Sequence, residues 1–286
     1  MAYAVPMRQK FVYGLSARGF HNIAYTVWGK ATAARTAVCV HGLTRNARDF
    51  DRLAAALAAT GYRVVCIDVV GRGASDDLRD PTLYAYPQYL SDMAVVLARL
   101  GTRQVDWVGT SMGGLIGIIL AAQPQSPIRR LVLNDVGPFI PAAAMARIAH
   151  YITAVPPLPD FASALHYIQS IYRNTGPCTA ADYQAMTEHS IVTLPGGGYR
   201  LRYDPAIAQN FAAIKGDVDL WAYYDAIPCP TLLLRGALSD VLTAETATEM
   251  TQRGPHAQLA TIPNIGHFPG LMDASQIGMV QQFLAG

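Results

Sequence analysis

The sequence predicts an α/β protein with a mostly parallel, doubly wound sheet and a helical segment inserted into it. Two observations carry this prediction. From residue 36 to residue 136, short apolar runs typical of buried strands alternate with helix-like segments, and the alternation returns from residue 230 onward. Between these parts, residues 138–227 contain helical stretches but no buried strand of that kind. Strands that alternate with helices pair in parallel and carry helices on both faces.

The composition is that of a globular protein with no marked preference for charged partners. Of its 286 residues, 51% are hydrophobic, so the chain can bury a large core, and one domain with a substantial insertion is expected. The formal net charge is +2, with acidic and basic residues interspersed. This pattern indicates no nucleic acid and no membrane as partner. The sequence does not set the oligomeric state.

Targeting signals and cysteines bear on the compartment. Residues 1–10 contain no apolar segment of signal-peptide length, and no run approaches the ~18 apolar residues of a membrane span. The four cysteines are widely spread, form no C-x-x-C pair, and two lie in apolar, strand-like runs. We therefore expect a cytoplasmic protein whose cysteines are free, buried thiols.

The first half of the chain supplies most of the predicted sheet. Two segments of alternating polarity, at residues 11–17 and 23–28, predict a hairpin at the sheet edge. Continuous apolar runs predict buried strands at residues 36–40, 62–69, 104–108 and 128–136. Helical spacing or small apolar residues predict helices at residues 47–59, 89–100 and 115–122. Gly61 and Gly101 end the first two of these helices.

The inserted segment differs from the rest in its pattern. Its helical stretches are residues 141–153, 161–173 and 180–191, separated by Pro- and Gly-rich breaks at 156–159 and 195–198. It also holds eight of the fifteen tyrosines, and tyrosine suits the wall of a substrate cavity, although most of these rings should pack helices together. The sheet pattern then resumes with strands at residues 230–236 and 257–262 and helices at 244–253 and 275–284.

The motif that carries chemistry is G-x-S-x-G at residues 109–113. It follows an apolar strand and precedes a helix rich in small residues, so Ser111 should stand on a tight turn at the carboxyl end of the sheet. Larger side chains at Gly109 and Gly113 would collide with the neighbouring strand and helix. The helix N-terminus points N–H groups at the place where negative charge develops. The motif predicts a nucleophilic serine.

Five segments resemble the α/β-hydrolase superfamily in order and spacing. They are residues 40–43, 67–75, 109–114, 234–240 and 265–268. The chain is most similar to the esterase and carbon-carbon hydrolase branch, and it differs from epoxide hydrolases and haloalkane dehalogenases, which carry aspartate where Ser111 stands. The resemblance implies an eight-stranded sheet with a helical cap inserted after the sixth strand. It predicts a core of residues 1–137 and 228–286 and a cap of residues 138–227.

A serine nucleophile needs a base and an acid that orients the base. His267 is the best candidate for the base because it lies in a loop between the last predicted strand and helix. His41 is expected to hold a loop instead. In this fold the acid stands between serine and histidine in sequence. We favour Asp240, after the strand at residues 230–236, over Asp135, which ends the preceding strand and is where some relatives place the acid.

The remaining site residues follow from the resemblance and from the absence of other motifs. The resemblance implies that the backbone N–H groups of Leu43 and Met112 form the oxyanion hole. Arg45 and Arg72 are either solvated loop residues or contacts for an acidic substrate group. The sequence contains no metal-ligand spacing, phosphate loop or dinucleotide fingerprint, so we infer no cofactor and no metal.

These features predict a serine hydrolase that cleaves small to medium carboxylic esters through an acyl-enzyme. The alternatives are a carbon-carbon bond hydrolase of aromatic ring-cleavage products, a cofactor-free haloperoxidase or acyltransferase, and a non-catalytic small-molecule receptor on the same fold. The substrate is expected to be a small apolar ester, because aliphatic and aromatic residues of the insertion should close an apolar pocket over Ser111. These residues are Phe139, Ile140, Met145, Ile148 and Trp221.

Overall fold

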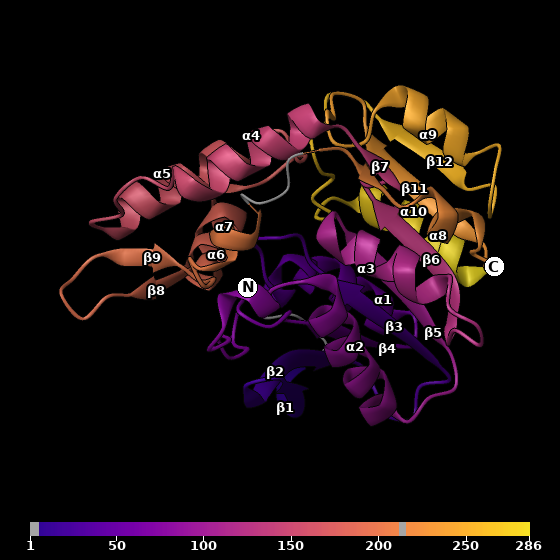
Figure 1. Cartoon of the computed structure of the whole chain (residues 1–286), viewed down its shortest axis with the longest axis horizontal. Helices are drawn as coiled ribbons and strands as arrows, with labels where there is room; N and C mark the ends of the chain where they lie inside the picture. The colour runs from indigo at the N-terminus through magenta and orange to yellow at the C-terminus, as the bar shows by residue number, and fades with distance from the viewer. Residues whose placement is uncertain (1–5, 212–215) are drawn as a thin grey trace.

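The computed structural model describes residues 6–211 and 216–286. Eight strands form one sheet in the order β1-β2-β4-β3-β5-β6-β11-β12 (Figure 1). The strands are β1 (Met7–Ser16), β2 (Gly19–Trp28), β3 (Arg35–Val40), β4 (Tyr62–Ile67), β5 (Val105–Thr110), β6 (Ile128–Asn134), β11 (Thr231–Gly236) and β12 (Gln258–Ile262). β1 and β2 form the antiparallel hairpin at one edge, β2 is antiparallel to β4, and the other neighbours are parallel. The predicted mostly parallel, eight-stranded sheet is confirmed.

Helices cover both faces of the sheet because its central strands are apolar on both sides. Every residue of β5 is buried, as are all but the first of β3. On one face lie α1 (Asp51–Ala59) and α10 (Ala274–Ala285), and on the other lie α2 (Tyr86–Leu100) and α3 (Met112–Ala121), together with α9 (Ala244–Met250). The doubly wound arrangement thus buries two apolar layers, one on each side of the sheet.

The predicted helix at residues 47–59 is in fact two pieces. A 3₁₀ turn, η1 (Ala47–Phe50), precedes α1, and Asn46 caps it by accepting the Arg48 N–H. A second 3₁₀ turn, η2 (Pro81–Leu83), precedes α2. α2 begins three residues before the predicted start, because Pro87 is compatible with the first turn of a helix.

The segment between β6 and β11, here called the insertion, is largely helical. Its helices are α4 (Ala142–Thr153), α5 (Phe161–Tyr172), α6 (Ala180–Ser190), α7 (Ile207–Phe211) and α8 (Trp221–Asp225). Two small ladders pair β7 (Phe139–Ile140) with β10 (Val218–Asp219) and β8 (Ile191–Thr193) with β9 (Tyr199–Leu201). Figure 1 shows α4, α5 and the β8–β9 hairpin projecting to the left of the sheet. The predicted break at residues 195–198 is the turn of that hairpin.

Backbone hydrogen bonds join the insertion to the loop that follows β4. The Gly73 N–H donates to the Arg202 carbonyl, and the Asp204 N–H donates to the Gly71 carbonyl. Arg72 and Tyr203 form an isolated antiparallel bridge between these bonds. The loop at residues 71–73 therefore fixes the insertion relative to the carboxyl ends of the central strands.

Two further predictions concern the whole chain. Cys39, Cys66 and Cys229 are buried free thiols, and Cys178 is a free thiol that is half-buried. In the described parts of the chain, each helix is too short or too polar to cross a membrane.

Candidate active site

Ser111 stands on a sharp turn between β5 and α3, as the motif predicts. Its backbone has φ 50° and ψ −117°, a strained conformation for a residue other than glycine. A Cβ atom on Gly109 would lie 2.3 Å from the Gly113 carbonyl oxygen, and one on Gly113 would lie 2.0 Å from the Val40 carbonyl oxygen. Since only glycine fits at both positions, the two glycines allow the turn that exposes the serine hydroxyl.

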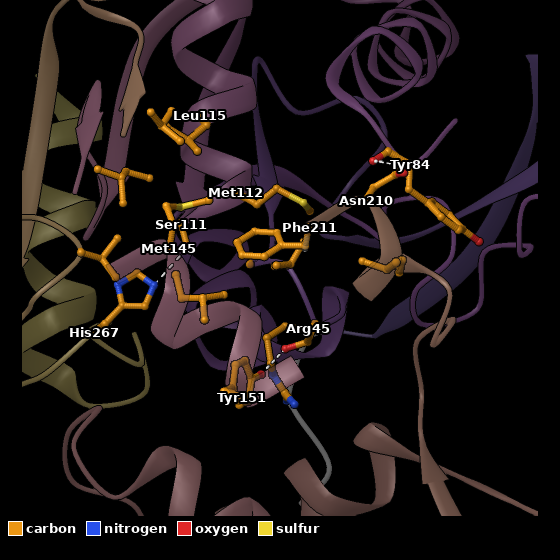
Figure 2. A pocket seen from close by; sticks show the side chains of 18 of the residues that line it. Arg45, Tyr84, Ser111, Met112, Leu115, Met145, Tyr151, Asn210, Phe211 and His267 are labelled. Atoms are coloured by element: carbon orange, nitrogen blue, oxygen red, sulfur yellow. Dashed lines mark hydrogen bonds between the residues drawn. The ribbon is translucent and has the colours of Figure 1, made fainter. Parts of the chain in front are cut away.

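Hydrogen bonds connect the Ser111 hydroxyl to His267 and then to Asp135. The distance from His267 Nε2 to Ser111 Oγ is 3.1 Å (Figure 2), and the distance from His267 Nδ1 to Asp135 Oδ2 is 2.7 Å. Asp135 is fully buried, and its carboxylate also accepts the Gly236 N–H at 2.7 Å and the Ser239 hydroxyl at 2.6 Å. A carboxylate at Nδ1 keeps the proton there, which leaves Nε2 as the acceptor for the serine hydroxyl.

The structure corrects the choice of Asp240 as the acid beside His267. The Asp240 carboxylate lies half-exposed and pairs with Arg147 of α4, with Oδ1 2.8 Å from Arg147 Nη2. Asp135, the alternative, occupies the position beside His267. The loop after β11 still contributes to this site, because Ser239 supports the Asp135 carboxylate. Sequence analysis did not predict this role of Ser239. The only indication of it in the sequence was that Ser239 directly precedes the candidate acid Asp240.

Leu43 and Met112 lie beside Ser111 in the wall of the pocket. Met112 is the first residue of α3, so its N–H has no acceptor one turn earlier in the helix. Among the described residues, no backbone or side-chain acceptor takes the Leu43 N–H. Within the described parts of the chain, these two N–H groups therefore have no protein acceptor, and both residues line the pocket that contains Ser111.

His41 orients one of these N–H groups. It is fully buried, and burial lowers its pKa to about 3, so the ring is neutral. Its Nε2 accepts the Val69 N–H at 3.0 Å, which leaves Nδ1 to donate to the Gly42 carbonyl at 2.7 Å. The Gly42 carbonyl and the Leu43 N–H belong to one planar peptide group and point in opposite directions. Holding the carbonyl therefore fixes the direction of the Leu43 N–H. His41 has the loop-holding place that its sequence position predicted.

A pocket of about 610 Å³ lies in front of Ser111, between the core and the insertion. Its lining is mostly apolar, and Figure 2 shows Met112, Leu115, Met145 and Phe211 around the serine. Of the insertion tyrosines, Tyr151 and Tyr172 line the pocket. Tyr84, Tyr86 and Tyr89, which precede or begin α2, also line it. Their cluster around the start of a predicted helix was a signal that sequence analysis did not use.

Three of the five insertion residues expected at the pocket do line it, namely Ile140, Met145 and Ile148. Phe139 and Trp221 do not. The Trp221 ring instead packs edge-on against Tyr224, with centroids 5.6 Å apart, and the Arg253 guanidinium lies 4.2 Å from its centroid. The Trp221 ring thus contacts α8 and the segment after α9, outside the pocket lining.

Neither Arg45 nor Arg72 is a solvated loop residue, because both are buried. Arg45 lines the pocket and forms a bidentate ion pair with Asp49, with N···O distances of 2.7 and 3.0 Å. Its guanidinium lies 4.7 Å from the Tyr172 ring centroid. Arg72 lies outside the pocket lining and donates to the Leu43 carbonyl at 2.9 Å.

Comparisons with known proteins identify the family of this chain. A family model described as the alpha/beta hydrolase fold matches residues 37–157. The chain is 42% identical to a 3-hydroxybutyrate-oligomer hydrolase of Cupriavidus necator, over 98% of each chain. It also resembles the solved structure of an alpha/beta hydrolase from Novosphingobium aromaticivorans, at 33% identity and a TM-score of 0.86, over 100% of this chain and 99% of that one. The solved structure of a protein from Rickettsia typhi, described as a hydrolase, is also similar. It is 33% identical with a TM-score of 0.90, over 98% of this chain and 99% of that one. This chain therefore belongs to the α/β-hydrolase family, and it is an ester-cleaving hydrolase.

Proposed function

We propose that this hydrolase cleaves short linear esters through an acyl-enzyme on Ser111, with His267 as the base and Asp135 as the acid that orients it. The observation that carries the proposal is the hydrogen-bonded chain from Ser111 through His267 to Asp135. A serine hydroxyl is a poor nucleophile at neutral pH, and this arrangement supplies the base that it needs.

Acylation begins when Ser111 Oγ attacks the carbonyl carbon of the ester and its proton passes to His267 Nε2. The carbonyl oxygen becomes an oxyanion, which accepts hydrogen bonds from the Leu43 and Met112 N–H groups. Collapse of this intermediate breaks the bond to the alcohol oxygen, and His267 gives the proton to the leaving alcohol. A water molecule, deprotonated by the same histidine, then attacks the acyl-enzyme, and the proton returns to Ser111 as the acid leaves.

For the substrate we propose short oligomers of 3-hydroxybutyrate and esters of similar size. Two observations support this class. The Cupriavidus necator relative, aligned over nearly the whole chain, is a 3-hydroxybutyrate-oligomer hydrolase. The pocket of about 610 Å³ is mostly apolar, and the two arginines that line it, Arg45 and Arg147, are each paired with a carboxylate. Such a pocket suits the uncharged, flexible ester units of these oligomers, whose charge is confined to the terminal carboxylate.

We also propose that the insertion, residues 138–227, acts as a cap on a core of residues 1–137 and 228–286. Residues of α4, α5 and α7 form one wall of the pocket, so the insertion limits what reaches Ser111. The proposed location is the cytoplasm, because the four cysteines are free thiols, the state that a reducing compartment maintains.

A fluorophosphonate probe tests the nucleophile. We expect the wild-type protein to be labelled at Ser111 and Ser111→Ala to be unlabelled while it keeps its unfolding midpoint. Ser170→Ala, at an exposed serine of α5, is the matched control and should label as the wild type does. Labelling that persists in Ser111→Ala contradicts the assignment.

Turnover of the linear 3-hydroxybutyrate dimer and trimer, measured beside p-nitrophenyl butyrate, tests the substrate class. We expect the wild type to hydrolyse all three and Ser111→Ala to hydrolyse none. If the nitrophenyl ester is cleaved and both oligomers are not, the substrate class is wrong while the mechanism stands.

A further inference from the structure

Arg72 is the most deeply buried cation near the active site, with 1% of its surface exposed. None of the ion pairs formed by the described residues includes it. Its guanidinium is instead held by neutral groups. It donates to the carbonyls of Leu43 and Val70 at 2.9 and 2.8 Å and to the Tyr89 hydroxyl at 3.1 Å. Because arginine stays protonated in proteins, this charge is buried without being neutralised.

The contacts of Arg72 reach both halves of the oxyanion hole. Arg72 Nε bonds the Leu43 carbonyl, which fixes the peptide that follows Leu43, while His41 fixes the peptide that precedes it. Arg72 Nη2 lies 3.8 Å from the Met112 sulfur. Leu43 and Met112 are the two residues whose N–H groups are free beside Ser111. One guanidinium therefore contacts both residues, Leu43 through its backbone carbonyl and Met112 through its side chain.

The other arginines at the pocket differ from Arg72 in their partners. Arg45 pairs with Asp49 and Arg147 pairs with Asp240, so each presents a neutral ion pair to the cavity. The aromatic rings of Tyr84 and Tyr89, with centroids 5.6 and 5.2 Å from the Arg72 guanidinium, cover its charge from solvent. In a region that excludes water, a charge acts over a longer distance than at the surface. Arg72 thus places behind the oxyanion hole a positive charge that no ion pair of the described residues includes.

We propose that Arg72 is a positioning residue for the oxyanion hole, which holds the Leu43 backbone and the Met112 side chain in place and stabilises the oxyanion with its charge. This inference rests on the proposed acyl-enzyme mechanism. Arg72 touches no reacting atom and acts through the two residues in front of it. Its contribution grows when negative charge develops on the substrate oxygen, so it should favour the transition state over the bound substrate.

The test compares Arg72→Met, which removes the charge at similar length, with Arg72→Lys, which keeps it. With p-nitrophenyl butyrate, we expect Arg72→Met to lower kcat about 10- to 100-fold, somewhat less than the loss of a direct donor, and to leave KM within about twofold. Arg72→Lys should recover at least half of this loss on a logarithmic scale. Arg63→Met is the matched control, because Arg63 also donates to a main-chain carbonyl, that of Leu100, but lies on β4 away from the pocket.

Two inhibitors separate positioning at the oxyanion hole from a general structural role. A trifluoromethyl ketone with a butyl chain adds to Ser111 and carries an oxyanion, whereas the matching methyl ketone only fills the pocket. We expect Arg72→Met to weaken the trifluoromethyl ketone by the same factor as kcat and to leave the methyl ketone unchanged. Equal weakening of both, a loss confined to KM, or an unchanged kcat would overturn the inference. If Arg72→Met does not fold, Arg72→Gln, which also lacks the charge, replaces it in the comparison, and the absence of a selective loss against the trifluoromethyl ketone in that variant overturns the inference.

The proposed function can fail separately from this inference. If the fluorophosphonate probe does not label Ser111 in the wild type, the mechanism and the role of Arg72 fall together. If the wild type is labelled and Arg72→Met keeps full affinity for the trifluoromethyl ketone, only the role of Arg72 is refuted.

Discussion

At the scale of single residues, three donors converge on the Asp135 carboxylate. The Gly236 N–H holds Oδ1, while the Ser239 hydroxyl and His267 Nδ1 share Oδ2. This carboxylate therefore has one orientation, in which Oδ2 faces the imidazole. The fixed orientation keeps His267 Nε2 directed at Ser111 and selects the tautomer that can accept the serine proton.

We predict that Asp135→Asn lowers kcat by about 10⁴, the loss expected when the imidazole takes the wrong tautomer. Asp240→Asn is the control, because Asp240 forms a half-exposed ion pair with Arg147, and such pairs contribute little. It should change kcat less than about threefold. Steady-state kinetics with p-nitrophenyl butyrate at pH 8 measures both variants. A larger loss for Asp240→Asn than for Asp135→Asn would mean that Asp240 orients His267 in solution.

The sequence could not separate these two aspartates, for a geometric reason. β6 and β11 are parallel neighbours, with Asn134 opposite Leu234, so the residues that follow both strands gather at one edge of the sheet. Each aspartate is therefore near His267 by topology alone. The backbone decides between them, because Asp135 has φ 54° and its N–H bonds the Leu234 carbonyl. The residues around Asp135 do not predict this positive φ.

At the scale of elements, the loop from His41 to Asn46 links β3 to η1 and carries the Leu43 N–H, which we propose as an oxyanion donor. Two buried side chains, His41 and Asp68, hold this loop, and burial shifts their pKa values in opposite directions. His41 has its pKa lowered to about 3 by burial, and Asp68, which accepts the Ala47 and Ala74 N–H groups, has its pKa raised to about 6 by burial. Both shifts arise because the charged form loses its hydration.

The stability of the fold should depend on pH through His41. Between pH 3 and 6.5 the unfolded chain protonates this histidine and the folded state does not, so the free energy of unfolding should fall as the pH falls below 6.5. Relative to His41→Asn, the wild type should lose on the order of 2 to 3 kcal/mol between pH 7 and 4.5. Urea denaturation of both proteins at the two pH values measures this difference.

The difference between the unfolding free energies of the wild type and His41→Asn cancels the contribution of Asp68. That contribution has the opposite sign to that of His41. The folded state binds a proton at Asp68 between pH 3.8 and 6 more readily than the unfolded chain does, so this group stabilises the fold as the pH falls. A wild-type curve parallel to that of His41→Asn would show that His41 is protonated in the folded state, against its neutral, loop-holding role.

Elements differ in how well their sequence predicts them. The long strands and helices follow from continuous apolar runs and helical spacing, and their order along the chain is as predicted. The ladders β7–β10 and β8–β9 contain two or three residues per strand. Strands this short have no readable period, and β7 finds its partner nearly eighty residues later in the chain. Tertiary packing creates them, so a local pattern could not predict them.

At the scale of the whole molecule, the pocket exists only where the core and the insertion meet. The sequence predicted its apolar character, and Ile140, Met145 and Ile148 do line it. Its size and its other wall, which includes Tyr84, Tyr86 and Tyr89, depend on how α4 and α7 pack over the loop before α2. Contacts between segments so far apart in sequence could not be predicted from either segment alone.

The last prediction concerns acyl chain length. Each buried methylene contributes about 0.8 kcal/mol, so two or three added carbons should raise kcat/KM roughly ten- to fiftyfold until the pocket is full, after which it should fall. Ile148→Ala enlarges the pocket and should move the optimum to a longer chain. Ile152→Ala, one turn later in α4 at a buried position outside the pocket wall, should reduce stability and leave the optimum in place. A series of p-nitrophenyl esters from two to sixteen carbons measures both effects. A rate that rises through sixteen carbons, or jumps when the substrate forms an interface with water, would mean that the insertion opens like a lipase lid and does not limit substrate length.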